Sequence, residues 1–150
     1  MYKRHLLGHL SARNPLLKVT KEAPTVKVIF SGPHGYISPR WHGDQVVPTW
    51  NYASVSMICA LNIINESNDK LKAMEQISHY FDPQWDFNNF SQSSNKKMVL
   101  QMLKAITVFS LEIIEVKSKF KLSQNRSNAC RVAFKEQLRL AGNKNLAKIQ

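Results

Sequence analysis

The sequence predicts a mixed α+β fold, with a β-rich first half and helices added later. Residues 46–64 and 106–122 form long apolar stretches rich in β-branched side chains, which favours strands. Most segments with apolar residues at helical spacing lie after residue 67. A chain of 150 residues is most simply one domain, and it is long enough to bury a core without disulfides or metals.

The first half is expected to alternate short strands with turns. Strands are predicted over residues 4–11, 25–32, 36–41 and 46–64. The glycine- and proline-containing segment "GPHGY" (32–36) and the segment "HGDQ" (42–45) predict turns. A short helix is expected over residues 12–22, because Asn14 suits the N-cap and Pro15 suits the first helical position.

The second half is expected to hold the larger helices and one long strand, over residues 106–122. The amphipathic segments that predict helices are 68–81, 95–106 and 130–142. Asn68 is the expected cap of the first, and Gly142 is the expected stop of the last. Residues 82–94 contain turn residues and three aromatic residues, so they are expected to form a loop.

The predicted strand at residues 46–64 contains an unusual segment. At period two, Asn51 shares a row with apolar residues such as Ala53, while Trp50 and Tyr52 occupy the other face. An ordinary half-buried strand does not place an amide in its apolar row. Trp50 and Asn51 are therefore candidates for binding a planar heterocycle, through an aromatic plane and an amide. The alternative is that Trp50 only fills the core.

Polar residues also gather where two apolar strands end. The end of the first strand carries His9, Ser11, Arg13 and Asn14. A helix is expected to begin there, and its unpaired N–H groups together with Arg13 would favour an anion. The end of the strand at 106–122 carries Lys119, Lys121, Gln124, Asn125 and Arg126. The simpler alternative is that Asn14 caps a helix and the lysines face water.

The net charge is +11, and it is concentrated toward the end of the chain. From Lys117 onward there are nine basic residues and one acidic residue. Such an excess attracts polyanions and phosphorylated ligands, although a solvated, solubilising tail is the alternative.

Several classes of function are excluded by missing patterns. The sequence contains no glycine-rich phosphate loop, no histidines at metal-ligand spacing with a Cys or carboxylate, and no pair of carboxylates that nominates itself for catalysis. We therefore expect no metal site and assign no catalytic residue. No apolar run has the length needed to span a membrane. Cys59 and Cys130 are far apart, as expected for reduced thiols in a cytoplasmic protein.

Four blocks of the sequence resemble the PaiB family, in the family's order. They are "HLLGHLSARNP", "VIFSGPHGYISPRW", "VPTWNY" and "KFKLSQNR", and together they cover most of the chain from His5 to Arg126. The family comprises FMN-binding split β-barrel proteins described as negative transcriptional regulators. The resemblance implies a single split-barrel domain over residues 1–150, with added helices and a basic C-terminal helix at about 127–150. It also implies FMN as the cofactor and a homodimer with the flavin at the subunit interface.

In proteins of this kind, polar strand ends hold the flavin phosphate and ribityl chain, while aromatic and amide groups border the ring. The residues that the resemblance assigns to the cofactor are His9, Ser11, Arg13, Asn14, Trp50, Asn51, Lys121, Gln124 and Arg126. The sequence departs from the family motif at Ser56, where the family has His, and at Cys59, where it has Gly. It also begins in mid-pattern, so we expect the first barrel strands to be missing and the strands at 4–11 and 46–57 to leave an unpaired edge.

The leading hypothesis is a cytoplasmic, homodimeric FMN-binding protein that acts as a transcriptional regulator. No helix-turn-helix pattern is present, so the basic C-terminal segment is the candidate for contact with DNA. Two alternatives remain open. One is a flavin-dependent reductase or oxidase, and the other is a nucleic-acid-binding module without a cofactor.

Overall fold

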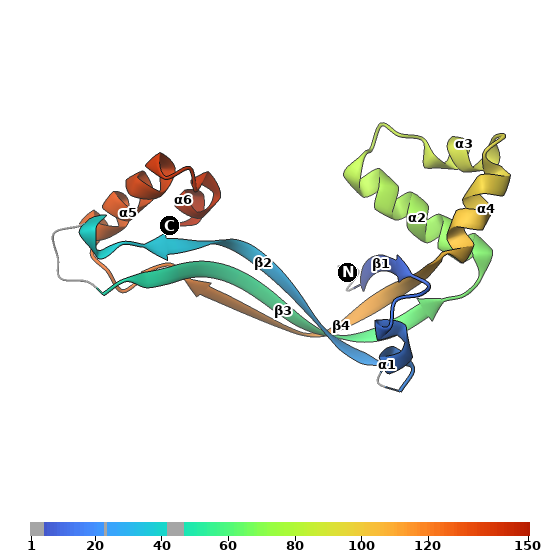
Figure 1. Ribbon diagram of the computed structural model, residues 1–150, viewed down its shortest axis with the longest axis horizontal. Coiled ribbons are helices and arrows are strands. Elements are labelled where there is room, and N and C mark those ends of the chain that lie inside the picture. Colours follow the sequence, from blue (N-terminus) through green and yellow to red (C-terminus); the bar gives the residue numbers. More distant parts are fainter. Residues whose placement is uncertain (1–4, 23, 42–46) are drawn as a thin grey trace. The chain divides into compact units, whose positions relative to one another are not determined.

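A computed structural model describes residues 5–22, 24–41 and 47–150. The turn expected at residues 42–45 lies outside this described part. Four strands form one sheet in the order β1-β4-β3-β2 (Figure 1). Their bounds are His5–Ser11 for β1, Thr25–Ile37 for β2, Thr49–Ile64 for β3 and Ile106–Lys121 for β4. The strands predicted at 4–11, 46–64 and 106–122 are therefore confirmed, with small shifts at their ends.

Helices follow from local capping and from amphipathic spacing. The helices are α1 (Leu16–Glu22), α2 (Ser67–Phe81), α3 (Phe87–Gln92), α4 (Lys96–Lys104), α5 (Asn128–Leu140) and α6 (Lys144–Ile149), with a 3-10 turn η1 at Pro39–Trp41. The predicted cap of α1 is confirmed, because the Asn14 Oδ1 accepts a hydrogen bond from the Leu16 N–H at 2.9 Å. Helix α5 ends before Gly142, whose φ of 81° only glycine adopts easily.

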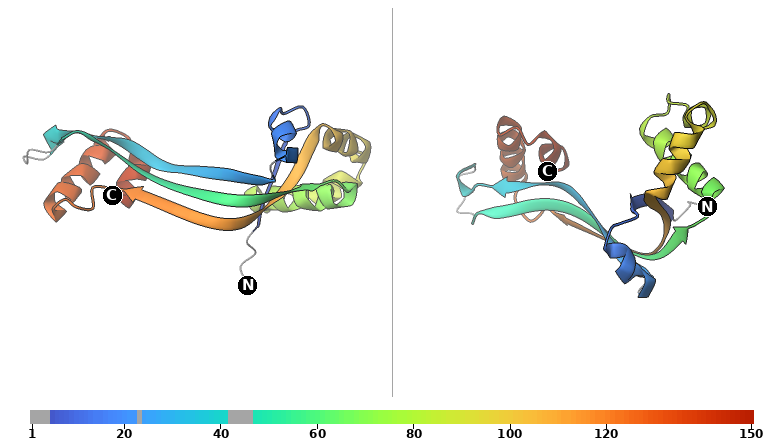
Figure 2. Two further views of the ribbon diagram at one scale, coloured as in Figure 1. Left: turned by 90° about the horizontal axis from the view of Figure 1, so that it is seen from below. Right: turned by 45° about the vertical axis from the view of Figure 1, so that its right-hand side comes forward.

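The chain is divided into two compact units. The first unit comprises residues 1–27 and 58–115, and the second comprises residues 28–57 and 116–150. Strands β2, β3 and β4 each contribute to both units, and further views show these three strands running side by side (Figure 2). The two units are described separately below.

In the first unit, β1 pairs antiparallel with β4, and α2, α3 and α4 pack against one another. The pairing places Gly8 opposite Phe109, and it continues past β1 with a hydrogen bond from the Ala12 N–H to the Ala105 carbonyl at 2.8 Å. The buried apolar residues of this unit are Cys59, Ala73, Val99, Leu103, Val108 and Leu111.

In the second unit, α5 and α6 cover one face of the strands (Figure 1). The core residues are Ile37, Leu122, Cys130, Phe134, Leu138, Leu146 and Ala147, with Trp41 packed beside them. Cys130, Phe134 and Leu138 recur every four residues, so one stripe of α5 faces the core. The amphipathic helix predicted near this position is confirmed.

The turn predicted at residues 32–36 is wrong, because β2 continues without interruption to Ile37. Gly32 and Gly35 instead allow neighbouring residues to pack closely against β2. A Cβ atom at Gly32 would lie 2.9 Å from the Ala53 carbonyl oxygen, and one at Gly35 would lie 2.6 Å from the Asn143 Nδ2. The strand predicted at 36–41 is therefore the end of β2 followed by η1, where Pro39 cannot continue the ladder.

Three further expectations require correction. Residues 82–94 are not all loop, since α3 lies within them and the Asp86 side chain caps it by accepting from the Asn89 N–H at 2.8 Å. Asn68 is not a cap, because α2 begins one residue earlier, after Glu66. The basic segment expected as one helix at about 127–150 forms two, α5 and α6.

Of the two strands expected to leave an unpaired edge, the strand at 4–11 does lie at an edge of the described sheet, as β1, but the strand at 46–57 does not, because β3 lies between β4 and β2. Among the described strands, β1 and β2 are the outer ones. The long outer strand is thus β2, on which Ile29 and Phe30 are exposed.

Candidate functional site

A basic cleft of about 450 Å³ lies at the end of β1 in the first unit. Its charged lining residues are Arg13, Lys18 and Lys70, which come from the β1–α1 connection, α1 and α2. Leu17 and Ile63 add apolar surface to the same cleft. The volume falls within the roughly 300–1,000 Å³ typical of small-molecule sites.

The main-chain N–H groups at the start of α1 already have partners. The Leu16 N–H donates to the Asn14 side chain, the Leu17 N–H to the Asn14 carbonyl at 3.1 Å, and the Lys18 N–H to the Pro15 carbonyl at 3.1 Å. The helix N–H groups that we expected to attract an anion are thus occupied. Any anion at this end of β1 must be held by side-chain cations.

The side chains of the basic cleft suit a phosphate group. Three cations line it, and its described lining contains no acidic residue. Arg13 is exposed and offers a planar, multidentate donor, while Lys18 and the half-buried Lys70 offer point charges. The donor set therefore fits the phosphate of FMN, and the apolar surface fits a less polar part of the same ligand.

Two other predicted residues of β1 lie in different surroundings. His9 lines a separate, apolar pocket of the first unit, together with residues of α2, α3 and α4. Ser11 helps to fix the β1–α1 connection, because its Oγ accepts a hydrogen bond from the Arg13 N–H at 3.3 Å. The strand end thus brings Arg13 and Asn14 to the basic cleft and His9 to another hollow.

In the second unit, Asn51 is fully buried within a hydrogen-bond network. Its Nδ2 donates to the Ser123 Oγ at 3.0 Å and to the Gln150 Oε1 at 2.9 Å. Its Oδ1 accepts from the Ser123 hydroxyl at 3.2 Å. The Gln150 Nε2 in turn donates to the Leu122 carbonyl at 2.6 Å. Asn51 is therefore satisfied by protein groups, and it ties β3 to the ends of β4 and α6.

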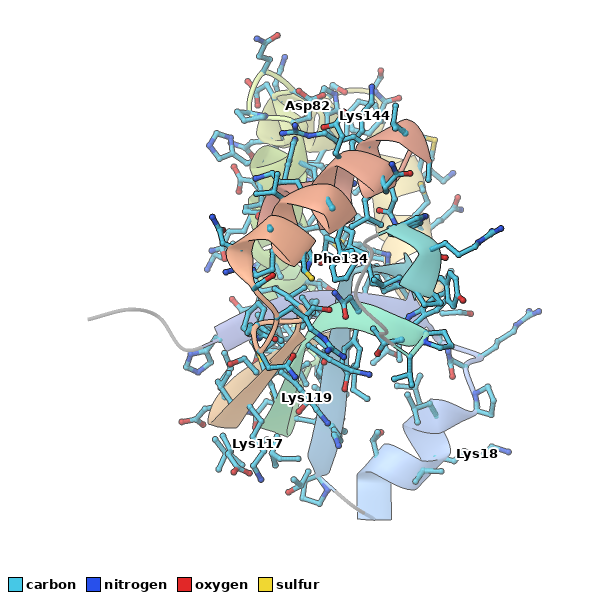
Figure 3. All side chains as sticks on the ribbon, turned by 90° about the vertical axis from the view of Figure 1, so that its left-hand side faces the viewer. Lys18, Asp82, Lys117, Lys119, Phe134 and Lys144 are labelled. Carbon is cyan, nitrogen blue, oxygen red and sulfur yellow. The ribbon has the colours of Figure 1, made fainter. Side chains whose placement is uncertain are left out.

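Trp50 lies on the opposite face of β3 and is 51% exposed. Its ring stacks on His34 of β2, with centroids 5.9 Å apart and planes inclined by 29°. The neighbouring Tyr52 ring lies 5.9 Å from the Lys119 Nζ, so an aromatic row and a lysine row share this face. Figure 3 shows Phe134 on the side of the strands covered by α5, and Lys119 on the other side. Trp50 is thus an open aromatic surface and not a core residue.

The remaining predicted residues lie at or just beyond the end of β4. Lys121 is exposed. Gln124 closes the turn, since its Oε1 accepts from the Leu122 N–H at 2.8 Å and its Nε2 donates to the Phe120 carbonyl at 2.7 Å. The half-buried Arg126 donates its main-chain N–H to the Ser123 carbonyl at 3.0 Å.

The basic residues of the second unit do not form a single surface. Lys117 and Lys119 project from β4 on the side away from α5 (Figure 3), and Lys121 follows them at period two. Arg131 of α5 is occupied by a 2.8 Å hydrogen bond from its guanidinium to the Gln150 carbonyl. Arg139 and Glu136 form an exposed ion pair at 3.5 Å.

Sequence reasoning missed Lys18, Lys70 and His34. Lys70 belongs to a helix far along the chain from Arg13, so only the fold brings them to one cleft. The sequence predicts a turn at His34, whereas its stacking on Trp50 depends on β2 continuing as a strand. No motif marks any of these three residues.

Within the part of the chain that the structure describes, no helix has both the length and the hydrophobicity required to cross a membrane. The described residues also contain no group of three or more His, Cys, Asp or Glu side chains placed to hold a metal ion.

Solved structures similar to this chain show its fold. The FAD and heme binding protein from Mycobacterium smegmatis matches 89% of this chain and 61% of its own, with a TM-score of 0.58 and 15% identity. The flavocytochrome Anf3 from Azotobacter vinelandii matches 89% of this chain and 58% of its own, with a TM-score of 0.55 and 15% identity. This chain thus spans about three fifths of the length of these two structurally similar proteins. The predicted α+β split β-barrel of the FMN-binding type, with added helices, is confirmed.

Sequence comparison identifies a relative and a family. The chain is 28% identical over 141 residues to the Bacillus subtilis protein named "Protease synthase and sporulation protein PAI 2", covering 94% of this chain and 68% of that protein. Residues 2–115 match the family described as "Putative FMN-binding domain". The predicted PaiB resemblance is confirmed, and FMN is the cofactor that the family description names. This chain belongs to that family of FMN-binding domains.

Proposed function

We propose that this protein binds FMN and that the basic cleft of the first unit holds the phosphate group. The observation that carries this proposal is the convergence of Arg13, Lys18 and Lys70 on one cleft without an acidic neighbour among its described lining residues. When bound, FMN supplies a ring that accepts and donates electrons. The protein's own contribution at this cleft is charge and orientation.

The test compares FMN with riboflavin, which lacks the phosphate. Arg13→Ala and Lys70→Gln should each weaken FMN binding by about tenfold or more, since each removes a charge-assisted contact worth about 1.5–3 kcal/mol. Riboflavin affinity should not change. Flavin fluorescence titration measures both constants, and Lys72→Gln is the matched control, because Lys72 lies on the same helix and pairs with Asp69 at 3.3 Å. Equal FMN affinity in the parent and in Arg13→Ala would refute the phosphate assignment.

For the second unit, considered by itself, we propose that Trp50 borders a flavin ring. Trp50 is exposed and already stacks on His34, which supports a role as an aromatic surface for a planar ring. Trp50→Leu should therefore lower the affinity for FMN and for riboflavin by the same factor. An unchanged affinity for both flavins would remove Trp50 from the proposal.

We also propose that the protein is a cytoplasmic homodimer and that residues 1–150 act as one domain, because β2, β3 and β4 run through both units. The exposed apolar residues on the outer strand β2 support pairing with a second copy. The mass in solution, measured by light scattering over a range of dilutions, tests the homodimer. A monomer at all concentrations would contradict it.

Transcriptional regulation through DNA contact is the remaining part of the proposal, and the basic residues of α5 and α6 support it. The variant Lys135→Gln, Arg139→Gln, Lys144→Gln should flatten the salt dependence of DNA binding, which has a slope of about 0.9 per neutralised phosphate. A matched variant removes the same charge from β4, at Lys117, Lys119 and Lys121. If only the β4 variant flattens the slope, or if DNA does not bind at low salt, α5 and α6 are not the DNA contact.

A further inference from the structure

An apolar pocket of about 220 Å³ lies among α2, α3, α4 and the strands β1 and β4 of the first unit. This pocket is separate from the basic cleft, because no residue lines both of them. His9 supplies the one ionisable side chain in the described lining. The pocket therefore offers a mostly apolar interior with a single ionisable group.

Aromatic and methionine side chains form the walls of this pocket. The Trp85 ring lies 5.6 Å from the Phe87 ring and 5.4 Å from the Phe90 ring, measured between centroids. Met74 and Met102 contribute polarisable thioethers. Val99 and Leu103 are buried, whereas Met102 is 61% exposed. His9, Trp85 and Met102 are the exposed residues of the described lining, so the pocket is open to solvent beside them, whereas Val99 and Leu103 of α4 are held by packing.

The size of the pocket limits what it can hold. An apolar cavity of about 150 Å³ is enough to bind benzene, and drug-sized ligands need about 300 Å³ or more. At about 220 Å³, this pocket accommodates one ring with a small substituent. A flavin is too large for it, so a ligand here would be additional to FMN.

We propose that this pocket binds a small aromatic molecule that carries one hydroxyl or carbonyl group. The ring packs between the aromatic residues and the two methionines, where edge-on and sulfur–aromatic contacts are favourable. The polar substituent forms a hydrogen bond with the imidazole of His9. This assigns His9 a ligand other than the flavin phosphate.

Phenol and toluene are suitable probes, because they differ only in the group that would contact His9. The chain has five methionines, so ¹³C-methyl labelling of methionine gives few, separable NMR signals. Saturable shifts are expected for Met74 and Met102, while Met57 in the second unit should not move. Phenol should bind about threefold to tenfold more tightly than toluene, as one added hydrogen bond allows. His9→Leu should abolish that preference without abolishing toluene binding.

A plugged variant and its control complete the test. Met102→Trp places a bulky ring at the exposed side of the pocket and should abolish the Met74 shift. Met98→Trp, at an exposed position of the same helix that does not line the pocket, should preserve it. Probe binding that survives Met102→Trp, or no saturable shift with either probe, would overturn the proposal. Shifts of Met74 that depend on protein concentration without any probe would also overturn it, by assigning the pocket to a second copy of the chain.

Discussion

Replacing Asn51 with alanine removes the centre of a buried network that joins three separate segments of the second unit. The side chain connects β3 to Ser123, beyond the end of β4, and to Gln150, at the end of α6. Ser123 has a φ of 57°, a left-handed conformation that a serine seldom adopts. The network helps to hold Ser123 in that conformation, so the substitution acts on the backbone as well as on side chains.

The expected cost follows from the groups left without partners. Asn51→Ala leaves the Ser123 hydroxyl and the Gln150 Oε1 unpaired, and these residues are only 8% and 7% exposed. Each unsatisfied buried group costs about 1–3 kcal/mol, so the free energy of unfolding should fall by about 2–6 kcal/mol. That is a large fraction of the roughly 5–15 kcal/mol that stabilises a typical domain.

Urea titration followed by circular dichroism measures this loss, with Asn62→Ala as the control because Asn62 is an exposed amide on the same strand. The control should change the free energy of unfolding by less than about 0.5 kcal/mol. A cycle with Ser123→Ala should give a coupling energy of at least about 0.5 kcal/mol. If Asn51→Ala is as stable as the parent but binds FMN less tightly, the network interpretation fails and the role predicted from the sequence is correct.

Three further perturbations test the fold and its edge. Gly35→Ala should lower the free energy of unfolding by about 1–3 kcal/mol in a urea titration, because its Cβ would meet the Asn143 side chain at 2.6 Å; an unchanged value would contradict that contact. Phe134→Ala should cost about 3–5 kcal/mol in the same assay, since Phe134 is 1% exposed, and a loss below about 1 kcal/mol would remove it from the core. Ile29→Lys places a charge on the outer strand β2 and should convert a dimer to a monomer in light scattering, whereas an unchanged mass would exclude this edge.

The sequence is informative where a residue acts on its own neighbours. Asn14 caps α1 as predicted, because capping depends on residues two or three positions away. The stop at Gly142 is similarly local. The glycines of β2 led to the wrong prediction of a turn. They are needed because the strand packs closely against Ala53 and Asn143, which are distant in sequence. A glycine that permits close approach and a glycine that permits a turn have the same appearance in a sequence.

In the candidate site too, contacts between residues distant in sequence could not be predicted. Arg13 could be nominated because it follows a strand and precedes a helix, but its partners Lys18 and Lys70 carry no motif. Closeness in sequence predicts that His9 and Arg13 belong to one site, yet the two side chains line different hollows. Proximity along a strand end therefore predicted the location of polar groups but not which of them act together.

The adjacent residues Trp50 and Asn51 show how one short segment can serve two purposes. Side chains alternate along a strand, so Asn51 faces the side covered by α5 and α6 while Trp50 faces the open side. The buried amide is satisfied by protein groups, and its loss should change stability. The exposed indole has only His34 as a ring partner among the described residues, and its loss should change binding. Because the two effects fall on different measurements, Asn51→Ala and Trp50→Leu together distinguish a strand that only builds the fold from one that also presents a ligand surface.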